Sequence, residues 1–419
     1  MYWRSRSWRR GSRARRDRIP RRWRCSCTVL TAPRVLFLDH TSALGGAELC
    51  LLDVAEHLRE RSLVALLADG PFRLRLGARG IRTVVLEEAA SLQLVKRESR
   101  VPGPGAVSAV VSTARAVAKV AREYDLVYAN SQKAFIVACV AAFFARKPVL
   151  WHLHDILDPK VFSRINIAID VFLANHVAAR VIANSQATAS ALRARGGTRA
   201  RIDVVYNGLD PAVAGAVTDA DATAMRASLG LGSGPLLGLF GRLAPWKGQH
   251  VAIQALGLID VTTDVELVIV GDALFGEESY AAELRALVAK QELTKRVHFL
   301  GFRDDVPVLM RMVDVVIHTS TAPEPFGRVI AEGMLAERPV IATAGGGASE
   351  IVRAGETAWQ VQPNSPVDLA TAILDVLEDP ACARKIARAG RADALARFTL
   401  AVTLPQIERA IELAAGGRA

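Results

Sequence analysis

Short apolar segments alternate with helical stretches from residue 34 onward, and this alternation constrains the fold more than any other feature. Helical patterns occur at residues 47–60, 106–122 and 161–178. Apolar runs bounded by polar residues, Gly or Pro are typical of buried strands, and they occur at residues 35–39, 63–68, 83–86, 126–129, 149–152, 181–183 and 202–206. Because apolar strands joined by helices form parallel sheets covered on both faces, this part of the chain predicts one such sheet.

A second series of the same kind follows a pause in the pattern. Residues 207–235 carry several Gly, Pro and Asp turn signals and predict a linker with a short helix. Beyond this linker, strands are predicted at residues 236–240, 267–270, 297–300, 315–318, 340–342 and 359–361. The predicted fold class is therefore α/β, with two doubly wound, Rossmann-like parallel-sheet domains that face a cleft. Ligands of such sheets bind outside the carboxyl ends of the strands, so we expect the site between the domains.

The composition excludes several classes of protein. With 51% hydrophobic and 23% charged residues, the chain is neither disordered nor collagen-like. Its longest uncharged apolar run, residues 134–145, is too short to span a bilayer. Five cysteines without a C-x-x-C pair are typical of the reducing cytoplasm, which is the location we expect.

The net charge of +11 is concentrated at the N-terminus. Residues 1–24 hold eleven Arg and one Asp, so the remaining residues sum to about +1. We therefore predict a disordered Arg-rich tail at residues 1–30, a first domain at 31–212, a second at 213–390, and a C-terminal helix at 391–419 that packs back toward the first domain. The near-neutral body argues against nucleic acid as a partner. Tryptophans among the arginines leave open a peripheral contact with an anionic membrane at its cytoplasmic face.

The densest cluster of polar residues is the segment 324–332, which follows a predicted strand and opens a helix near Gly327. Glu324 lies at the expected helix entrance and Glu332 lies inside the helix, so that the two are about 12 Å apart if the segment is helical throughout. Backbone N–H groups at Phe326 and Gly327 are expected to bind an anion or hydroxyls at the helix start. The alternative interpretation is one capping and one exposed glutamate.

Two further segments suit phosphate binding. Arg242 and Lys247 follow the first strand of the second domain, and their two positive charges match a nucleoside diphosphate. Gly45 and Gly46 follow the first strand of the first domain and allow close backbone approach to a phosphate at a helix N-terminus. The alternative for the two cations is a surface turn.

Two patterns could hold a metal, and we favour other interpretations for both. His152 and His154 share one face of a strand, but no third ligand is evident, so we expect His154 to contact a sugar hydroxyl, oriented by Asp155. Asp219 and Asp221 lie in the linker and are expected to cap a helix. No metal site and no cofactor are predicted.

Three segments in this order resemble glycosyltransferase family 4: G-R-L-x-x-x-K-G at 241–248, E-P-F-G…E at 324–332, and P-V-I-A-T…G-G…E-I-V at 339–352. The resemblance implies the GT-B fold and retention of anomeric configuration. It assigns the donor-sugar hydroxyls to Glu324, the ribose to Glu332, and the reaction centre to His154. Gly333 stands where the family usually has Ala.

The resemblance also assigns the diphosphate to Arg242 and Lys247, and the distal phosphate to the backbone of Gly46. We expect Gly45, Phe326, Gly327 and Val329 to complete the donor site. His154, Glu324, Arg242 and Lys247 form the expected catalytic set, and the resemblance places acceptor binding in the first domain.

The function expected from these residues is that of a retaining, metal-independent glycosyltransferase. It would move a hexose from a nucleoside-diphosphate sugar to a glycan, lipid or small-molecule acceptor. Two alternatives stay open, namely another GT-B activity such as sugar-nucleotide epimerisation and a non-catalytic nucleotide-sugar binding protein. Because no carboxylate is obviously placed as a nucleophile, we expect front-face transfer in which the departing phosphate deprotonates the acceptor.

Overall fold

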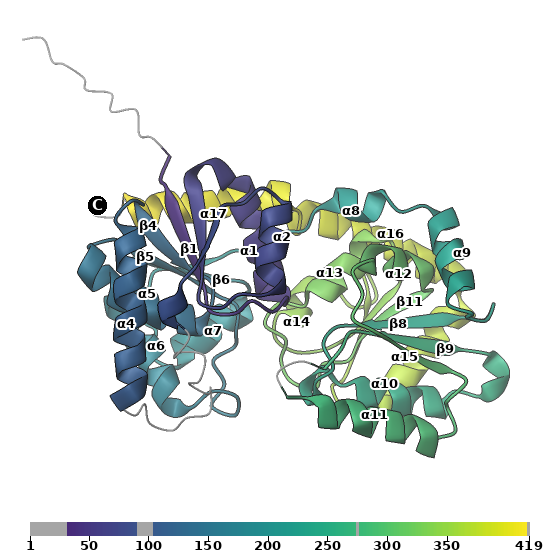
Figure 1. Ribbon diagram of the computed structural model, residues 1–419. Helices are drawn as coiled ribbons and strands as arrows, with labels where there is room; N and C mark the ends of the chain where they lie inside the picture. The colour runs from purple at the N-terminus through teal and green to yellow at the C-terminus, as the bar shows by residue number, and fades with distance from the viewer. Residues whose placement is uncertain (1–31, 90–103, 274–275, 417–419) are drawn as a thin grey trace, which may run out of the picture. The chain divides into compact units, whose positions relative to one another are not determined.

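The structure is a computed structural model that describes residues 32–89, 104–273 and 276–416, and Pro33–Ala419 form one compact unit (Figure 1). The predicted tail at residues 1–30 lies outside the described residues. No described helix combines the length and the apolar character that crossing a bilayer requires.

The first sheet has seven parallel strands in the order β3-β2-β1-β4-β5-β6-β7. The strands are β1 (Val35–Asp39), β2 (Ser62–Leu66), β3 (Thr83–Val85), β4 (Leu126–Ala129), β5 (Val149–Leu153), β6 (Arg180–Ala183) and β7 (Ile202–Val204). The order reverses direction between β1 and β4, and at such a switch point the loops beyond the strands diverge and leave room for a ligand.

The second sheet has six parallel strands in the order β10-β9-β8-β11-β12-β13. They are β8 (Leu236–Phe240), β9 (Glu266–Val270), β10 (Val297–Gly301), β11 (Val315–His318), β12 (Val340–Thr343) and β13 (Trp359–Val361). Here the switch lies between β8 and β11, the two strands that the GRLAPWKG and EPFG segments follow. The predicted fold class of two doubly wound parallel-sheet domains is confirmed.

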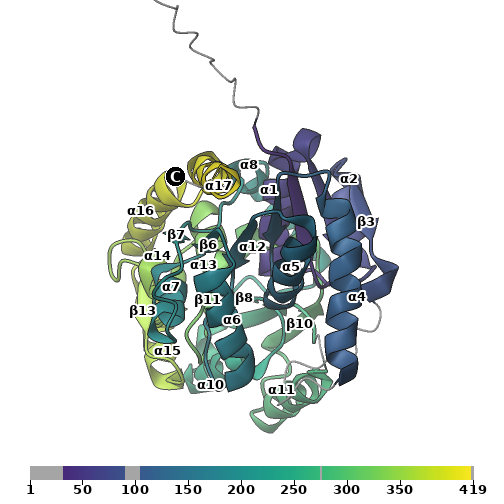
Figure 2. The same ribbon diagram turned by 90° about the vertical axis from the view of Figure 1, so that its left-hand side faces the viewer.

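Helices cover both faces of each sheet, because alternate residues of every central strand enter opposite cores. On β1, Leu36 and Leu38 pack with α4, α5 and α6, the helices labelled toward the viewer in Figure 2, whereas Val35 and Phe37 pack with α1, α2 and α17. The helices around the first sheet are α1 (Gly46–His57), α2 (Pro71–Ala78), α4 (Pro104–Ala121), α5 (Gln132–Ala145), α6 (Arg164–His176), α7 (Gln186–Ala194) and α17 (Leu400–Ala415).

The second sheet is covered in the same way. On β8, Leu237 and Leu239 pack with α10, α11 and α15, whereas Leu236 and Phe240 pack with α12, α13 and α16. These helices are α10 (Gln249–Leu258), α11 (Glu278–Lys290), α12 (Val306–Met312), α13 (Arg328–Leu335), α14 (Ala348–Ile351), α15 (Pro366–Glu378) and α16 (Pro380–Arg397).

The linker after β7 differs from the prediction in holding two short helices, α8 (Pro211–Gly215) and α9 (Asp219–Ser228). Asp221 closes a capping box with Thr218 at the start of α9, which confirms its capping role. Asp219 instead pairs with Arg311 of α12.

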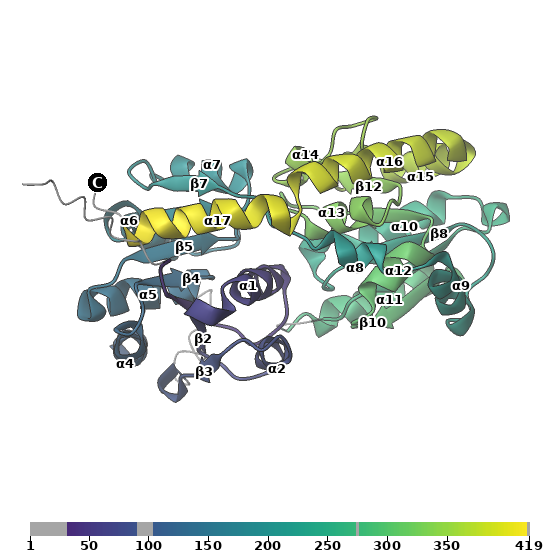
Figure 3. The same ribbon diagram turned by 90° about the horizontal axis from the view of Figure 1, so that it is seen from above.

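The end of the chain returns to the first sheet beside this linker. Leu209 and Thr399 form an isolated parallel bridge, so the outgoing and returning segments lie side by side. Gly208 is required there, because a Cβ would lie 2.1 Å from Thr403 Oγ1. Beyond the bridge, α17 runs along the first sheet, where Ile407 and Ile411 enter the core that contains Val35 (Figure 3).

Candidate active site

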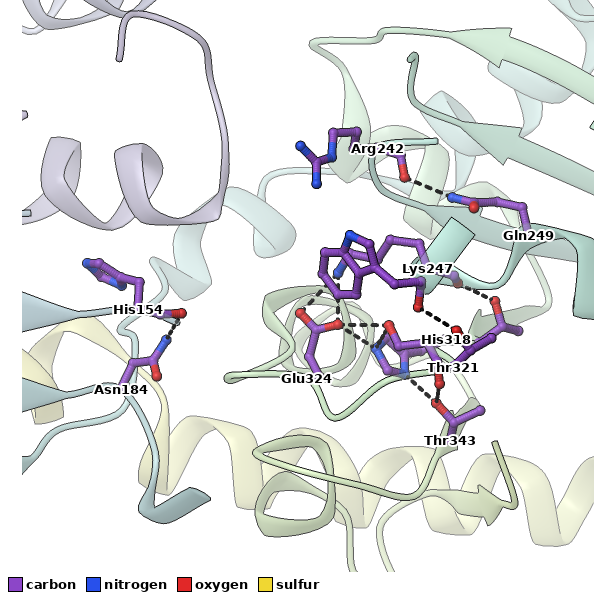
Figure 4. A network of polar contacts seen from close by, with 12 residues as sticks. His154, Asn184, Arg242, Lys247, Gln249, His318, Thr321, Glu324 and Thr343 are labelled. Atoms are coloured by element: carbon purple, nitrogen blue, oxygen red, sulfur yellow. Dashed lines mark hydrogen bonds and ion pairs between the residues drawn. The ribbon is translucent and has the colours of Figure 1, made fainter. Parts of the chain in front are cut away.

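The Glu324 carboxylate is the centre of a buried polar cluster at the carboxyl ends of β11 and β8 (Figure 4). Lys247 Nζ donates to both of its oxygens, at 3.0 Å to Oε1 and 2.8 Å to Oε2. Ser320 Oγ donates to Oε2 at 2.8 Å, and His318 Nε2 lies 3.3 Å from the same atom. The carboxylate is therefore held in one orientation by groups from two different loops.

His318 and Thr343 extend this cluster below the carboxylate. His318 is the last residue of β11, and its Nδ1 lies 3.3 Å from Thr343 Oγ1 at the end of β12. Thr343 Oγ1 donates to the Ser320 carbonyl at 2.9 Å. Adjacent parallel strands thus fix the imidazole that supports Glu324, so the carboxylate is positioned by regular structure as well as by its own loop.

Electrostatics keeps Glu324 ionised. Burial alone would raise the pKa of this carboxyl, but the charge of Lys247 and the hydrogen bond from His318 outweigh burial and hold the pKa well below its usual range. An ionised carboxylate can accept hydrogen bonds from hydroxyls, and the hydrogen bonds that it already accepts weaken it as a nucleophile.

Lys247 is the last residue of a one-turn helix, Pro245–Lys247, that follows β8. Its ammonium also lies over the Trp246 ring, 4.3 Å from the centroid. Gly248 ends the turn with φ 71°, and a Cβ there would lie 2.0 Å from the Thr319 carbonyl oxygen. Thr321 N donates to the Trp246 carbonyl at 2.8 Å. The loops after β8 and β11 are therefore bound to each other through their backbones.

Arg242 lies in the same loop, and the structure adds a carboxylate that the sequence analysis missed. This carboxylate is that of Glu277, whose Oε2 lies 3.5 Å from Arg242 Nε. The backbone carbonyl of Arg242 accepts a hydrogen bond from Gln249 Nε2 at 2.9 Å. Both expected phosphate-binding cations, Arg242 and Lys247, thus face an acidic side chain. A diphosphate would have to share these cations with Glu277 and Glu324.

His154 follows β5 in the first domain and is held by a chain of side chains. Its Nε2 lies 2.9 Å from Asn130 Oδ1, and Asn130 Nδ2 donates to Asp39 Oδ2 at 2.6 Å. Burial, with a smaller contribution from Arg328, lowers the pKa of His154 to about 4 although Asp39 opposes the shift. Its Nδ1 is buried and finds no hydrogen-bond partner within the described ranges.

His152 differs from His154 in its environment. Its Nδ1 lies 2.6 Å from Tyr128 Oη, and burial holds the pKa of the ring well below its usual range. The two imidazoles are close, with ring centroids 3.9 Å apart. In the part of the chain that the structure describes, no group of three or more His, Cys, Asp or Glu residues could hold a metal ion.

The Gly45–Gly46 pair begins α1 as expected, and a Cβ would be crowded at Gly45 but not at Gly46. A Cβ on Gly45 would lie 2.7 Å from Glu48 Oε2, and one on Gly46 would lie 3.5 Å from Arg328 Cδ. Burial and the nearby Asp39 raise the pKa of Glu48 to about 8. The turn therefore packs between an acid of its own helix and an arginine of the second domain.

Arg328 is a further residue of this site that the sequence analysis did not single out, although it lies inside the 324–332 segment. Its Nε lies 3.3 Å from Glu332 Oε1, one turn further along α13, and its Nη1 lies 3.9 Å from Asp53 Oδ2 in α1. It joins the predicted ribose-binding glutamate to the first domain. A basic residue between two glutamates that were predicted to bind the donor was the available signal.

The 324–332 segment opens its helix near Gly327, as predicted, and is not helical throughout. The helix begins at Arg328, and Gly327 precedes it with φ 103°, so the spacing of about 12 Å for eight helical residues does not apply. The Phe326 side chain is buried in the core between the second sheet and α12, α13 and α16, so only its backbone is left to bind a sugar donor. Val329 packs against the same core.

Comparison with known proteins matches both halves of the chain. Residues 44–213 match the family model "Glycosyltransferase Family 4", and residues 221–393 match "Glycosyl transferases group 1". Crystal structures of Anabaena Alr3699/HepE in complex with UDP and glucose, and with UDP-glucose, have TM-scores of 0.82 and 0.83. In both, 41% of residues are identical, and the match covers 91% of this chain and 99% of that chain.

Curated relatives are similar over shorter stretches. The 2-deoxystreptamine glucosyltransferase of Streptomyces kanamyceticus is 34% identical over 51% of this chain and 55% of its own length. The D-inositol 3-phosphate glycosyltransferase of Mycolicibacterium vanbaalenii is 35% identical over 43% of this chain and 42% of its own. The chain thus spans about half the length of the curated relatives that it matches. The two domain models and the likeness to HepE over nearly the whole chain show that this protein belongs to glycosyltransferase family 4, with the GT-B fold.

Proposed function

We propose that this glycosyltransferase moves a glucosyl residue from UDP-glucose to an acceptor hydroxyl with retention of configuration and without a divalent metal ion. The observation that carries the proposal is the 41% identity, over 99% of its length, to a protein whose crystal structure is a complex with UDP-glucose. The acceptor is proposed to be a glycan, a lipid-linked sugar or a small molecule that binds the first domain. The free Cys50, Cys139 and Cys382 are in keeping with a cytoplasmic location.

The geometry of the Glu324 cluster supports a role in holding the donor sugar. The carboxylate is ionised, buried and fixed by Lys247 and Ser320, so its remaining acceptor capacity is oriented before the sugar arrives. An oriented acceptor costs little reorganisation when the donor binds. His154, which is neutral at physiological pH, would accept or donate one hydrogen bond at the sugar from the other domain.

The two cations support departure of the nucleoside diphosphate. As the glycosidic bond breaks, negative charge grows on the leaving phosphate, and preorganised positive groups stabilise it. Before the donor binds, Lys247 forms an ion pair with Glu324 and Arg242 forms one with Glu277. The ammonium and the guanidinium are therefore already held in place. The charge supplied by these side chains is the reason to expect that no divalent ion is needed.

The binding test is a thermal-shift series with UDP, GDP and ADP, followed by the corresponding glucose donors. A nucleotide at 100 times its dissociation constant adds about 2.7 kcal/mol to the stability of the folded state. We expect stabilisation by UDP and UDP-glucose, loss of that stabilisation in Arg242→Ala, and its retention in Arg409→Ala, an exposed arginine of α17. Stabilisation by GDP or ADP in place of UDP would contradict the proposed donor.

The turnover test is release of UDP from UDP-glucose in the presence of candidate acceptors, with and without EDTA. We expect equal rates in both. Complete loss in EDTA that is restored by Mg²⁺ or Mn²⁺ would contradict the charge argument.

A further inference from the structure

Glu350 of α14 makes an unusual contact, because its carboxylate caps a helix of the other domain. Oε2 accepts from the backbone N–H of Gln186 at 2.9 Å, and Oε1 accepts from that of Ala187 at 2.7 Å. Both amides lie in the first turn of α7, beside the first sheet. Tyr206 Oη donates to Oε2 at 3.0 Å as a third partner. One carboxylate of the second domain thus satisfies two backbone donors of the first.

The start of α7 is well suited to receive this carboxylate. The first amides of a helix have no partner within the helix, and the helix dipole places about half a positive charge there. Ser185 Oγ accepts from Thr188 N at 3.0 Å, so the local cap serves the third amide and leaves the first two for Glu350. Hydrogen bonds from amides to an ionised carboxylate are stronger than those between neutral groups.

The chain just before Glu350 is bound to the loop between β11 and α13, residues 319–327, which carries Glu324 and is called the donor loop below. Gly347 N donates to the Glu324 carbonyl at 2.7 Å, and Gly346 forms an isolated parallel bridge with Glu324. A Cβ on Gly346 would lie 2.2 Å from the Glu324 carbonyl oxygen, and one on Gly347 would lie 2.4 Å from that of Pro325. Contacts as tight as these leave little room for the Glu350 segment to move without the backbone of Glu324.

Glu350 is also held through its backbone carbonyl, by an arginine of α16. Arg397 Nη2 donates to the Glu350 carbonyl at 2.7 Å, and its guanidinium lies 5.8 Å from the centroid of the Tyr206 ring. Tyr206 in turn lies near Phe326, with ring centroids 6.0 Å apart, and packs edge-on against Phe398 at 5.4 Å. Glu350 therefore lies where the donor loop, α7 and the returning segment before α17 meet.

We propose that Glu350 is a positioning residue that couples the two domains to the donor loop. By holding the α7 N-terminus, its carboxylate fixes where the first domain stands relative to Glu324, and hence where an acceptor held by the first domain meets the donor sugar. The cations proposed to bind the donor, Arg242 and Lys247, pair instead with Glu277 and Glu324. Loss of the contact should then slow transfer far more than it weakens nucleotide binding. The activity part of this proposal rests on the proposed function.

The test compares Glu350→Ala and Glu350→Gln with Glu356→Gln. Glu356 is a matched control in the same region, since it is exposed and pairs with Arg353 of its own domain. For Glu350→Ala we expect kcat to fall about 10–100-fold, in line with the cost of misplacing reacting groups by about 1 Å. The KM for UDP-glucose and the dissociation constant of UDP should change less than about twofold. Glu350→Gln, which keeps one acceptor oxygen, should lie between Glu350→Ala and the wild type.

Hydrogen exchange tests the contact without any substrate. The amides of Gln186 and Ala187 should exchange faster in Glu350→Ala, whereas the amide of Thr188, capped by Ser185, should change less. Unchanged exchange at residues 186 and 187 would overturn the contact. A raised KM with unchanged kcat would overturn the positioning role.

A second variant and the exchange measurement separate a folding failure from a failure of the proposed function. If Glu350→Ala does not fold, Tyr206→Phe removes one of the three donors and should lower kcat by a smaller factor with KM unchanged; no change in kcat would count against the proposal. If the wild type neither binds UDP nor uses UDP-glucose, the proposed function fails, but the exchange result still decides whether Glu350 caps α7.

Discussion

Replacing Lys247 with Met should destabilise the second domain by leaving the Glu324 carboxylate buried without its cation. The Met side chain keeps the length of the Lys stem, so the change removes mainly the ammonium. Breaking a buried ion pair by removing one partner costs about 3–5 kcal/mol. The Lys247 side chain is 21% exposed and Glu324 keeps its bond from Ser320, so we expect the lower end, about 3 kcal/mol. For a domain of this size that lowers Tm by about 6–12 °C.

The assay is thermal unfolding of the wild type, Lys247→Met, Glu324→Gln and the double variant at neutral pH. The double variant leaves no unpaired buried charge, so it should recover most of the loss, and the cycle should show a coupling energy of about 2 kcal/mol. Lys290→Met, at the exposed end of α11, is the control. Equal Tm changes in Lys247→Met and Lys290→Met would refute the view that this pair is buried and coupled.

The same pair sets a pH dependence of known sign. Because the folded protein holds the pKa of Glu324 below the ordinary value of 4.5, the stability it contributes is complete above pH 4.5 and is lost as the pH falls further. Without Lys247 the pKa of Glu324 rises. The difference in Tm between the wild type and Lys247→Met should therefore be largest near neutral pH and shrink in acid.

Three more outcomes are expected. Glu48 has a pKa raised from 4.5 to about 8 by burial and Asp39, so its contribution to stability is complete below pH 4.5 and lost as the pH rises through 8; Glu48→Gln should flatten this decline in Tm. Gly333→Ala would place a Cβ 3.1–3.2 Å from two buried valines of β11 and β12. This overpacking should lower the free energy of unfolding by about 1–3 kcal/mol, and the higher helix propensity of Ala should offset about 1 kcal/mol of that loss. Arg242→Ala should lower kcat on the order of 10²-fold in a steady-state assay, because it removes a cation from the leaving group.

The positions of the strands could be predicted closely from the sequence. Strand ends differ from the prediction by at most two residues, and the ends of the helices predicted at 47–60, 106–122 and 161–178 differ by at most three. The C-terminal helix predicted at 391–419 begins only at Leu400, because residues 391–397 belong to α16. The reason is that strands buried on both faces are nearly uniform in apolar character, so their limits coincide with the first polar residue or Gly. Residues in the loops after β8 and β11 could be assigned to a site because parallel strands end at a common edge.

The partners of those residues could not be predicted. Lys247 contacts Glu324, which is 77 positions away, and Glu350 contacts amides more than 160 positions away. Periodicity indicates which face of an element is buried, but it does not indicate which side chain of another strand or domain lies opposite. His318 was assigned only to a strand, because a histidine at a strand end has no distinguishing pattern until the neighbouring Thr343 is known.

The configuration of the product formed from UDP-glucose tests the central claim most directly. Proton NMR of the newly formed linkage, recorded with the first active acceptor, should show the same α configuration as the donor. Mass spectrometry of rapidly quenched enzyme should show no sugar attached to the protein, because Glu324 is held as an ionised hydrogen-bond acceptor by Lys247 and Ser320. A β-linked product, or glucose covalently bound to Glu324 or Asp155, would contradict the account.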